Sequence, residues 1–408
     1  MTFEEAKKKL SLYNQEHILK YYEDLNDEEK KLLLAQIDET DFSVIEAYIK
    51  KNTLNPKGVI SPLNALEIPD IEIRQKHFTE LGIEAIRNGI IGAVLLAGGM
   101  GTRLGSDNPK GMFNIGVTKV VYIFECLINN LMQVVNECGT YIHLFVMTSE
   151  KNHELTVNFF REQNYFGYDR DYIHFFRQEM APAIDYNGKI LMESKGRIAT
   201  SPNGNGGWFS SLMRSELYSL LQKNRIEYLN VFAVDNVLQK IADPAFIGAT
   251  IDNNCAVGAK VVRKSFPDEK VGVMCLENNH PSIIEYYELT DEMRNTLNEK
   301  GEPAYNFGVI LNYLFRVEDL VKISNGKLPL HIVEKQINHI DDNGSIVKPS
   351  APNGYKFEQL ILDMIRELDG CLPYEVVREK EFAPIKNAIG ADSVESARIL
   401  LKKNNIEL

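Results

Sequence analysis

Glycines and two cations gather in one short stretch, LLAGGMGTRLGSDNPKG, from Leu95 to Gly111. Glycine lets backbone N–H groups approach phosphate oxygens closely, and Arg103 and Lys110 supply positive charge beside them. Two familiar phosphate loops are excluded. The dinucleotide fingerprint G-x-G-x-x-G has Leu104 at its last glycine, and the Walker A motif needs Ser or Thr where Gly111 follows Lys110. The stretch predicts a phosphate-binding loop of another kind, with an ordinary glycine-rich turn as the alternative.

A second glycine-rich stretch, SPNGNGG, runs from Ser201 to Gly207 and directly precedes Trp208. So many glycines cost chain entropy on folding unless the backbone must curl round something. Asn203 and Asn205 could hydrogen-bond a polar ligand such as a base or a sugar. An ordinary surface loop is the alternative, and the tryptophan is expected in the core.

Single charged residues could complete such a site. The apolar run NVFAVDN ends in Asp235, and a carboxylate at the carboxyl end of a strand is well placed to hold a Mg²⁺ that bridges phosphates. One aspartate is a weak signal by itself. Glu285 and Glu288 in IEYYEL and Lys386 in FAPIKNA are typical of surface charges when each is considered alone. No Ser/His/Asp or Cys/His pattern stands out, which favours catalysis by charge over a covalent intermediate.

The elements that must position these residues alternate between short apolar runs and amphipathic helices. IIGAVLLAG, which leads into the first glycine stretch, is typical of a strand buried on both faces of a parallel sheet. VVYIFECLINNLMQVVNE has helical spacing, whereas VGVMCL and SIIEYYEL are separated only by ENNHP, a hairpin spacing. We therefore expect a mixed, mostly parallel sheet, with strands within Ile90–Gly98, Tyr141–Ser149, Tyr172–Gln178, Tyr228–Asn236 and Cys255–Lys264.

Three domains are expected along the chain. Residues 1–88 are predicted to be helical, with a helix-start signal at Asn26 and a stop at Gly89, and to serve packing or partner binding without a catalytic role. Residues 89–325 contain the alternating strands and helices. Residues 326–408, with the helical pattern ADSVESARILLKKN near their end, are expected to form a small α+β module.

Composition narrows the class of protein. The 408-residue chain carries a net charge of −12, which argues against broad nucleic-acid binding because that needs a basic surface. Its five cysteines are scattered without a C-x-x-C pair, which argues against a zinc site and suits a reducing compartment. No stretch reaches the roughly 20 apolar residues that a membrane span needs. We expect a cytoplasmic protein that binds neither nucleic acid nor membranes.

Taken in order, the motifs resemble those of the eukaryotic-type UDP-sugar pyrophosphorylases, and most closely the branch that makes UDP-N-acetylglucosamine. LLAGGMGTRLGSDNPKGM is similar to the signature G-G-x-G-T-R-L-G-x-x-x-P-K-G, and SPNGNGG to a P-D-G-N-G-G loop. Further similar segments are FFRQEMAPAIDYNGKI, FAVDN, IIEYYEL, KPSAPNGYKFEQLILD and YEVVREKEFAPIKNA. The resemblance implies an α/β fold with a Rossmann-like, GT-A-like nucleotidyltransferase core, a helical N-terminal arm and a small α+β C-terminal module.

The resemblance also implies a reaction and a role for each matching residue. The enzyme would be a UTP-dependent uridylyltransferase that joins UTP to a hexose or N-acetylhexosamine 1-phosphate, releases pyrophosphate and uses Mg²⁺. The implied catalytic residues are Arg103, Lys110 and Lys386. The implied contacts are Leu96, Ala97, Gly98, Gly99, Gln178 and Gly204 for the nucleotide, Asn205, Glu285 and Asn306 for the sugar, Lys356 for phosphate and Asp235 for the metal.

One departure from the family pattern bears on the sugar. The family's sugar-binding stretch is similar to F-N-A-G-N, whereas this chain has Tyr305, Asn306, Phe307, Gly308 and Val309. Valine replaces an amide that would contact the sugar, and loss of a polar contact can change discrimination between sugars. A UDP-glucose or broad-specificity UDP-sugar pyrophosphorylase is therefore the alternative enzyme. A nucleotide-sugar sensor without turnover is a more remote one, because binding alone needs fewer cations.

Overall fold

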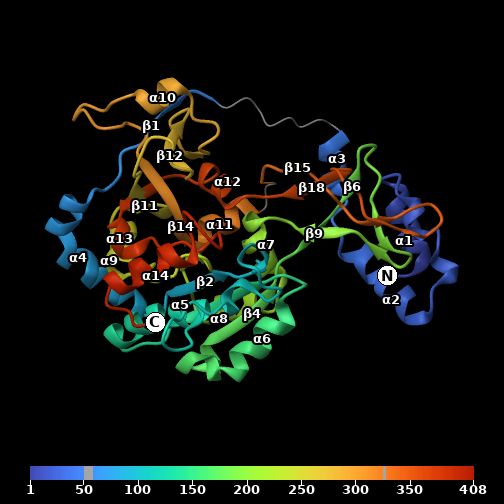
Figure 1. The fold of residues 1–408 in the computed structure, drawn as a ribbon, viewed down its shortest axis with the longest axis horizontal. Helices are drawn as coiled ribbons and strands as arrows, with labels where there is room; N and C mark the ends of the chain where they lie inside the picture. The colour runs from blue at the N-terminus through green and yellow to red at the C-terminus, as the bar shows by residue number, and fades with distance from the viewer. Residues whose placement is uncertain (50–57, 325–327) are drawn as a thin grey trace. The chain divides into compact units, whose positions relative to one another are not determined.

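The computed structural model describes residues 1–49, 58–324 and 328–408, which group into two compact units (Figure 1). Unit 1 combines residues 1–49, 179–207 and 328–361, and unit 2 combines residues 58–178, 208–324 and 362–408. Each unit is built from three separate stretches of chain and has its own hydrophobic core. The three domains expected from the sequence stay a prediction.

Unit 2 is an α/β structure. Its strands are β1 (Ile60–Pro62), β2 (Ile91–Leu96), β3 (His143–Thr148), β4 (Ile173–Arg177), β10 (Tyr228–Ala233), β11 (Val257–Arg263), β12 (Val273–Glu277), β13 (His280–Ile284), β14 (Phe307–Arg316) and β19 (Cys371–Glu375). Its helices are α4 (Ile68–Arg87), α5 (Ile123–Cys138), α6 (His153–Glu162), α7 (Trp208–Arg214), α8 (Leu217–Lys223), α9 (Pro244–Asp252), α10 (Asp291–Asn295), α11 (Val317–Ser324), α12 (Ile361–Arg366), α13 (Arg378–Glu381) and α14 (Val394–Lys403).

The ten strands form one mixed sheet, as the sequence predicts. The order is β1–β12–β14–β10–β2–β3–β4, with β11 beside β14, β19 beside β11 and β13 beside β12. The pairs β10–β2, β2–β3, β3–β4 and β11–β19 are parallel. The pairs that involve β12, and the two pairs that β14 makes with β10 and β11, are antiparallel. Parallel pairing therefore dominates only the half of the sheet that contains β2.

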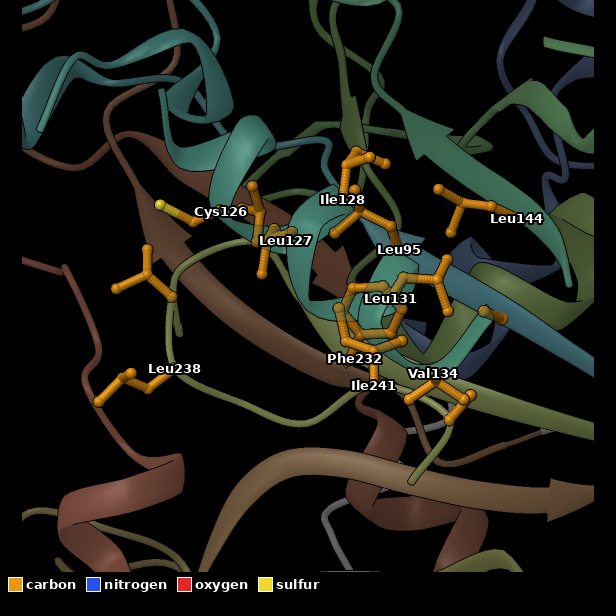
Figure 2. Packing of buried hydrophobic residues seen from close by; sticks show 14 of the residues in the cluster. Leu95, Cys126, Leu127, Ile128, Leu131, Val134, Leu144, Phe232, Leu238 and Ile241 are labelled. Carbon is orange, nitrogen blue, oxygen red and sulfur yellow. The ribbon is translucent and has the colours of Figure 1, made fainter. Parts of the chain in front are cut away.

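The strands around β2 are covered on both faces, which explains their continuous apolar sequences. Every residue of β2 is buried. Figure 2 shows Leu127 and Leu131 of α5 gathered with Leu95 of β2 and Phe232 of β10 in one cluster. Trp208 is fully buried and confirms its expected place in the core.

Strand register brings the carboxyl ends of the parallel strands to one edge of the sheet. Leu96, the last residue of β2, pairs with Ala233 of β10 and with Met147 of β3, and β4 continues the same register. The segments that leave these ends carry the first glycine stretch, Asp235 and Gln178. Ligands of α/β sheets bind at this edge, so the fold places these segments where a site can form.

Unit 1 carries the second glycine-rich stretch. Its helices are α1 (Phe3–Ser11), α2 (Asp27–Glu39) and α3 (Ser43–Ile49). Its strands are β5 (Met180–Pro182), β6 (Ile184–Asp185), β7 (Met192–Ser194), β8 (Arg197–Ile198), β9 (Thr200–Pro202), β15 (His331–Lys335), β16 (His339–Ile340), β17 (Ile346–Val347) and β18 (Gly354–Glu358). They form a three-stranded sheet, β15–β18–β6, and the pairs β5–β9, β7–β8 and β16–β17.

The N-terminal helices are part of the core of unit 1. Asn26 caps α2 in a capping box with Glu29, as its sequence predicts. Leu10 and Leu33 of these helices belong to the same buried cluster as Ile184 of β6 and Ile198 of β8. The N-terminal arm therefore helps to support the strands that lead into SPNGNGG. Among the described residues, no helix has the length and apolar character needed to cross a bilayer.

Candidate functional site

The first glycine stretch leaves β2 and folds back on itself. The Lys110 N–H donates to the Gly99 carbonyl over 3.1 Å, and the Gly101 N–H donates to the Asn108 carbonyl over 2.8 Å. A Cβ added to Gly99 would meet no other atom of the described chain within 4 Å. A Cβ on Gly98 would lie 3.0 Å from Gln178 Oε1, so Gly98 permits a close approach to that side chain. The loop is closed by its own backbone while Gly99 stays exposed.

Asn152, in the turn before α6, anchors the base of this loop. Its Nδ2 donates to the Ala97 carbonyl over 2.9 Å, and its Oδ1 accepts the Ser149 N–H over 2.7 Å. The Asn152 side chain is fully buried, as are the backbone neighbours that it joins. The carbonyl of Leu96 accepts the Val234 N–H. The carbonyls of Leu96 and Ala97, two residues expected to touch the nucleotide, are thus both hydrogen-bonded within the protein. Their nucleotide contacts stay predictions.

Lys110 and Asp235 meet at the carboxyl edge of the sheet. Lys110 Nζ lies 3.9 Å from Asp235 Oδ2, and the two side chains are 16% and 22% exposed. Burial lowers the pKa of the Lys110 ammonium below its ordinary value. Asp235 opposes this change, while the positive charges of Lys386 and Arg103 reinforce it. Two further cations therefore act on Lys110 against the one carboxylate that raises its pKa.

Lys386 also has a carboxylate partner. Its Nζ lies 3.3 Å from Asp392 Oδ2, and both side chains are more than a third exposed. The backbone joins the same two residues, since the Lys386 N–H donates to the Asp392 carbonyl over 2.6 Å. Asp392 has a φ of +52°, a left-handed conformation that Asp and Asn tolerate better than most residues. The loop from Lys386 to Asp392 therefore holds the ammonium and the carboxylate together.

Glu285, expected at the sugar, and Val309 both lie close to Gly272. A Cβ built on Gly272 would lie 3.4 Å from Val309 Cγ2 and 3.8 Å from Glu285 Oε1. The Glu285 N–H donates to the carboxylate of Glu288 over 2.9 Å. The valine that departs from the family pattern thus approaches the same glycine as the carboxylate expected to bind sugar hydroxyls, and it supplies methyl groups and no hydrogen bond there.

Asn306 and Phe307 hold the start of β14 against the end of β11. The Lys264 N–H donates to both the carbonyl of Asn306, over 2.9 Å, and its Oδ1, over 3.1 Å. The Phe307 ring packs against the Arg263 guanidinium, whose carbon is 5.2 Å from the ring centroid. The bulky residue at position 307 therefore has a packing role, and the sugar contact expected of Asn306 stays a prediction.

In unit 1, the second glycine stretch curls round a segment of its own chain. Gly204 has a φ of +87°, and a Cβ there would lie 2.2 Å from the Gln359 carbonyl oxygen. The Gly206 N–H donates to that carbonyl over 2.8 Å, and the Ile361 N–H donates to Asn205 Oδ1 over 3.0 Å. The close contact requires glycine at position 204. Asn205 uses its side-chain oxygen to hold the backbone, so ligand roles for Gly204 and Asn205 stay predictions.

The remaining expected residues divide between the two units. Lys356 lies on β18 of unit 1, where it pairs with Val333 of β15. Arg103 is an exposed residue of the first glycine stretch in unit 2, and Gln178 follows β4 in the same unit. Unit 2 therefore brings together the glycine loop, Asp235 and the three catalytic cations expected from the sequence, while Gly204, Asn205 and Lys356 belong to unit 1.

The oxygen ligands at the sheet edge, with Asp235 as the carboxylate, fit a Mg²⁺ ion that is bound mainly by substrate phosphates. Among the described residues, no group of three or more His, Cys, Asp or Glu side chains could hold a metal ion. Asp235 is a single, partly exposed carboxylate. Magnesium is commonly held by one or two carboxylates together with substrate phosphates and water, so Asp235 could serve it without a full protein cage.

Sequence reasoning missed residues that hold the site from outside its motifs. Asn152 bonds to a carbonyl 55 residues earlier in the chain, and no local pattern marks it. Asp392 follows Lys386 by only 6 residues, and its acidic side chain close to a lysine predicted to be catalytic was the available signal. A buried pair of charges, Lys260 and Glu381, is joined across 121 residues and has no sequence signature.

Comparison with known proteins gives three findings. Residues 52–408 match the family model described as UTP–glucose-1-phosphate uridylyltransferase. UDP-N-acetylglucosamine diphosphorylase 2 of Arabidopsis thaliana is 36% identical, over 96% of this chain and 82% of its own length, and UDP-N-acetylglucosamine pyrophosphorylase of Saccharomyces cerevisiae is 33% identical, over 97% and 85%. The crystal structure of the uridine diphosphate N-acetylglucosamine pyrophosphorylase from Trypanosoma brucei superposes with a TM-score of 0.82, at 29% identity, covering 97% of this chain and 83% of that one.

Proposed function

The chain belongs to the UTP–glucose-1-phosphate uridylyltransferase family, and from that membership we propose that it makes UDP-N-acetylglucosamine, or a close UDP-sugar, and pyrophosphate from UTP and the sugar 1-phosphate. Relatives named for UDP-N-acetylglucosamine cover nearly the whole chain. The observation that carries the proposal is the meeting of Lys110 with Asp235 beside the glycine loop, within the electrostatic reach of Arg103 and Lys386.

The reaction needs positive charge more than it needs a base. A phosphate oxygen of the sugar 1-phosphate attacks the α-phosphorus of UTP, and the bond from that phosphorus to the β-phosphate oxygen breaks as pyrophosphate leaves. The attacking oxygen is already anionic, so no side chain has to remove a proton. At an effective dielectric of about 20, two unit charges 4 Å apart interact by about 4 kcal/mol, so unshielded phosphates would repel strongly. Lys110, Arg103 and Lys386 can supply that shielding and align the phosphates.

The lowered pKa of Lys110 is consistent with this role. Desolvation and like charges disfavour the Lys110 ammonium, and a bound phosphate would offset them by supplying negative charge. Asp235 is the residue that would hold Mg²⁺, which when bound neutralises phosphate charge. Gln178 lies against Gly98 on the loop and would recognise the base.

A second candidate function is a UDP-glucose or broad-specificity UDP-sugar pyrophosphorylase. The observation that favours it is Val309, whose methyl groups lie by Gly272 together with the Glu285 carboxylate. If the missing amide binds the N-acetyl group in relatives, its loss weakens the preference for N-acetylated sugars over sugars such as glucose.

One experiment separates these functions. Pyrophosphate release from UTP is measured with N-acetylglucosamine 1-phosphate, N-acetylgalactosamine 1-phosphate, glucose 1-phosphate and no sugar phosphate, and each product is identified by chromatography. We expect kcat/KM to be highest for an N-acetylhexosamine 1-phosphate. A higher value for glucose 1-phosphate would establish the second candidate. Binding of UTP without pyrophosphate release in any mixture would leave the non-catalytic sensor.

Asp235→Asn tests the metal assignment. Asparagine keeps the shape of the side chain and removes its charge, so we expect a Mg²⁺ titration of activity that is shifted to higher concentration by about tenfold. Asp171→Asn is the control, because Asp171 precedes β4 at the opposite edge of the sheet. An unchanged titration in Asp235→Asn would show that the metal is held elsewhere.

A further inference from the structure

The segment that carries Asp235 is an irregular loop, yet most of it is buried. It leaves β10 at Val234 and reaches the start of α9 at Asp243. Leu238 and Ile241 belong to the core cluster around α5, as Figure 2 shows. A buried irregular loop must satisfy most of its backbone N–H and carbonyl groups outside a regular sheet, because unpaired polar groups in the core are costly.

Four amide side chains meet this need. Asn130 of α5 donates to the carbonyls of Val237 and Gln239, each over 3.1 Å. Gln239 donates to the carbonyls of Ala233 and Asn236 over 2.7 and 2.9 Å. Further bonds run from Asn312 to the Lys240 carbonyl and from the Ala242 N–H to Asn230. Side chains of α5, β10 and β14 therefore hydrogen-bond to the backbone of the Asp235 loop and hold it in place.

A buried charge cluster lies at the end of the same loop. Lys260 of β11 has no exposed surface, and its Nζ is 2.9 Å from Asp243 Oδ2 and 2.6 Å from Glu381 Oε2. The ammonium also donates to the Lys240 carbonyl over 3.3 Å. One cation thus joins the Asp235 loop, through Asp243 and Lys240, to Glu381, the last residue of α13.

The sheet is distorted where Lys260 enters it. Tyr313 of β14 pairs with Ala259, but the next pair joins Val309 to Val261, so β14 bulges opposite Lys260. Within the bulge Leu311 has a φ of +54°, a strained value for a residue other than glycine. Backbone strain of this kind persists only where the surrounding structure enforces it, and here it lies in the strand segment opposite Lys260.

Glu381 leads directly to Lys386. Asn236 Nδ2 donates to the Glu381 carbonyl over 2.7 Å, and Asn236 Oδ1 accepts the Ala383 N–H over 2.9 Å. The Ile385 N–H then donates to the Asp235 carbonyl over 2.8 Å. The chain from Glu381 to Lys386 is therefore laid along the loop from Asp235 to Val237, and its last residue carries a catalytic cation.

We propose that Lys260, Asp243 and Glu381 form a buried clamp that positions Asp235 and Lys386 relative to each other at the sheet edge, with Lys260 as the central positioning residue. The inference rests on the proposed function, because it assigns the clamp to the residues of that reaction. Buried ion pairs are often no more stabilising than well-packed apolar residues. What they add here is short, directional bonds to two segments that must hold their charges in place while phosphates react.

Glu381→Gln is the first test. It leaves Lys260 paired with Asp243, so the fold is expected to stay intact, but it replaces the shortest charge-assisted bond of the clamp by a weaker one. We expect kcat to fall about tenfold and the half-saturating Mg²⁺ concentration to rise at least about threefold, with KM for the sugar 1-phosphate within about threefold. The matched control is Glu277→Gln, a buried glutamate of β12 whose partners are Arg366, Ser282 and the Gly58 N–H.

A neutral variant separates positioning from stability. Lys260→Met combined with Asp243→Asn and Glu381→Gln removes all three charges, and we expect a melting temperature at or above that of Lys260→Met alone, with kcat still reduced about tenfold. Full kcat in the neutral variant, or values for Glu381→Gln that match those of Glu277→Gln, would overturn the proposal. If the wild type released no pyrophosphate, the proposed function would fail by itself. Calorimetric titration of UTP binding against Mg²⁺ would then test the clamp, and an unchanged Mg²⁺ requirement in Glu381→Gln would overturn it.

Discussion

Unit 2 contains two groups of charges that are paired in opposite ways. In the buried clamp, the Lys260 ammonium has no exposed surface and lies 2.6 and 2.9 Å from two carboxylates. At the sheet edge above it, Lys110 lies 3.9 Å from Asp235, and the positive charges of Arg103 and Lys386 add to its own. In the clamp, two carboxylates share one ammonium at hydrogen-bond distance, so every charge has a close partner. At the edge, positive charges outnumber the carboxylates and the pairing is looser.

The difference follows from what each group must do. Charges removed from water cost several kcal/mol each unless they are closely paired, so the clamp can exist only with short bonds on every side. Charges that receive a ligand must remain incompletely paired until the ligand arrives, because a satisfied cation would gain little from phosphate. Loss of a clamp charge should therefore act first on stability, and loss of an edge charge should act on activity.

Lys260→Met should give the largest effect. It leaves Asp243 and Glu381 buried without their cation, so we expect the free energy of unfolding to fall by about 3–5 kcal/mol near neutral pH. Chemical denaturation monitored by Trp208 fluorescence measures it. An unfolding free energy close to that of wild type would show that the two carboxylates are compensated by other groups.

The pH dependence of that variant has a defined sign. In the wild type, burial raises the pKa of Asp243, but the Lys260 ammonium, the Lys240 charge and the Ala245 N–H together outweigh burial and leave the pKa below its ordinary value. In the wild type, the Asp243–Lys260 ion pair therefore contributes to the free energy of unfolding above the ordinary carboxyl pKa, and this contribution is lost as pH falls. Without Lys260, burial is opposed only by the smaller lowering effects of Lys240 and the Ala245 N–H, so the pKa of Asp243 should rise and the stability deficit of the variant relative to wild type should narrow as pH falls from neutral. A gap that widens as pH falls would contradict this reading of the clamp.

Lys110→Ala should instead lower activity and leave stability unchanged or higher. We expect kcat to fall about a hundredfold, the order of magnitude typical when one preorganised donor to a reacting phosphate or oxyanion is removed. The melting temperature should stay equal or rise, because burial and the neighbouring cations disfavour the Lys110 ammonium. Lys119→Ala, an exposed lysine beyond the loop, is the control. Near-normal turnover in Lys110→Ala would remove the glycine loop from the reaction.

The same contrast explains what the sequence could reveal. The glycine stretch, the buried strand before it and Asp235 were predictable because each is a local pattern, and strand register then brings them to one edge. The mixed sheet was predictable from runs such as IIGAVLLAG and from the short hairpin connection. Edge charges lie within motifs, so a family resemblance can name them.

The clamp could not be predicted because its members are far apart and ordinary in type. Lys260 and Glu381 are 121 residues apart, and each is typical of a surface charge when its neighbours in sequence are considered alone. Asn205 shows the converse, since its motif suggested a ligand contact while the fold uses its oxygen to hold Ile361, 156 residues later. Only the tertiary structure distinguishes a polar group that holds the backbone from one that faces a ligand.

Lys110→Arg should change the pH dependence of activity. The lowered pKa of Lys110 means that its proton is lost at a lower pH than the ordinary lysine value of about 10.4, so activity should begin to fall below that pH. Arginine keeps its charge throughout this range, so the alkaline fall should move upward or vanish in the variant even if kcat is reduced. The pH profile of kcat/KM for UTP measures it. An unchanged alkaline limb would assign that limb to another group.

Asp392→Asn should give the smallest effect and tests how loosely the edge is paired. The Lys386–Asp392 pair is 38% and 37% exposed, and ion pairs of this kind are worth at most about 1 kcal/mol. Asparagine tolerates the φ of +52° and keeps the carbonyl that accepts the Lys386 N–H, so only the charge changes.

If Asp392 competes with phosphate for Lys386, removing its charge should lower KM for UTP by about twofold to fivefold at low salt, with kcat changed by less than about threefold. The difference should shrink as salt rises, since exposed charges are screened, and Asp171→Asn at the opposite edge should show neither effect. A KM that rises in Asp392→Asn would mean that the carboxylate holds Lys386 ready for phosphate and that its pair is an extension of the clamp. Asp392 would then belong with the charges that fix the structure, and Lys386 would be the last residue in this segment that binds phosphate.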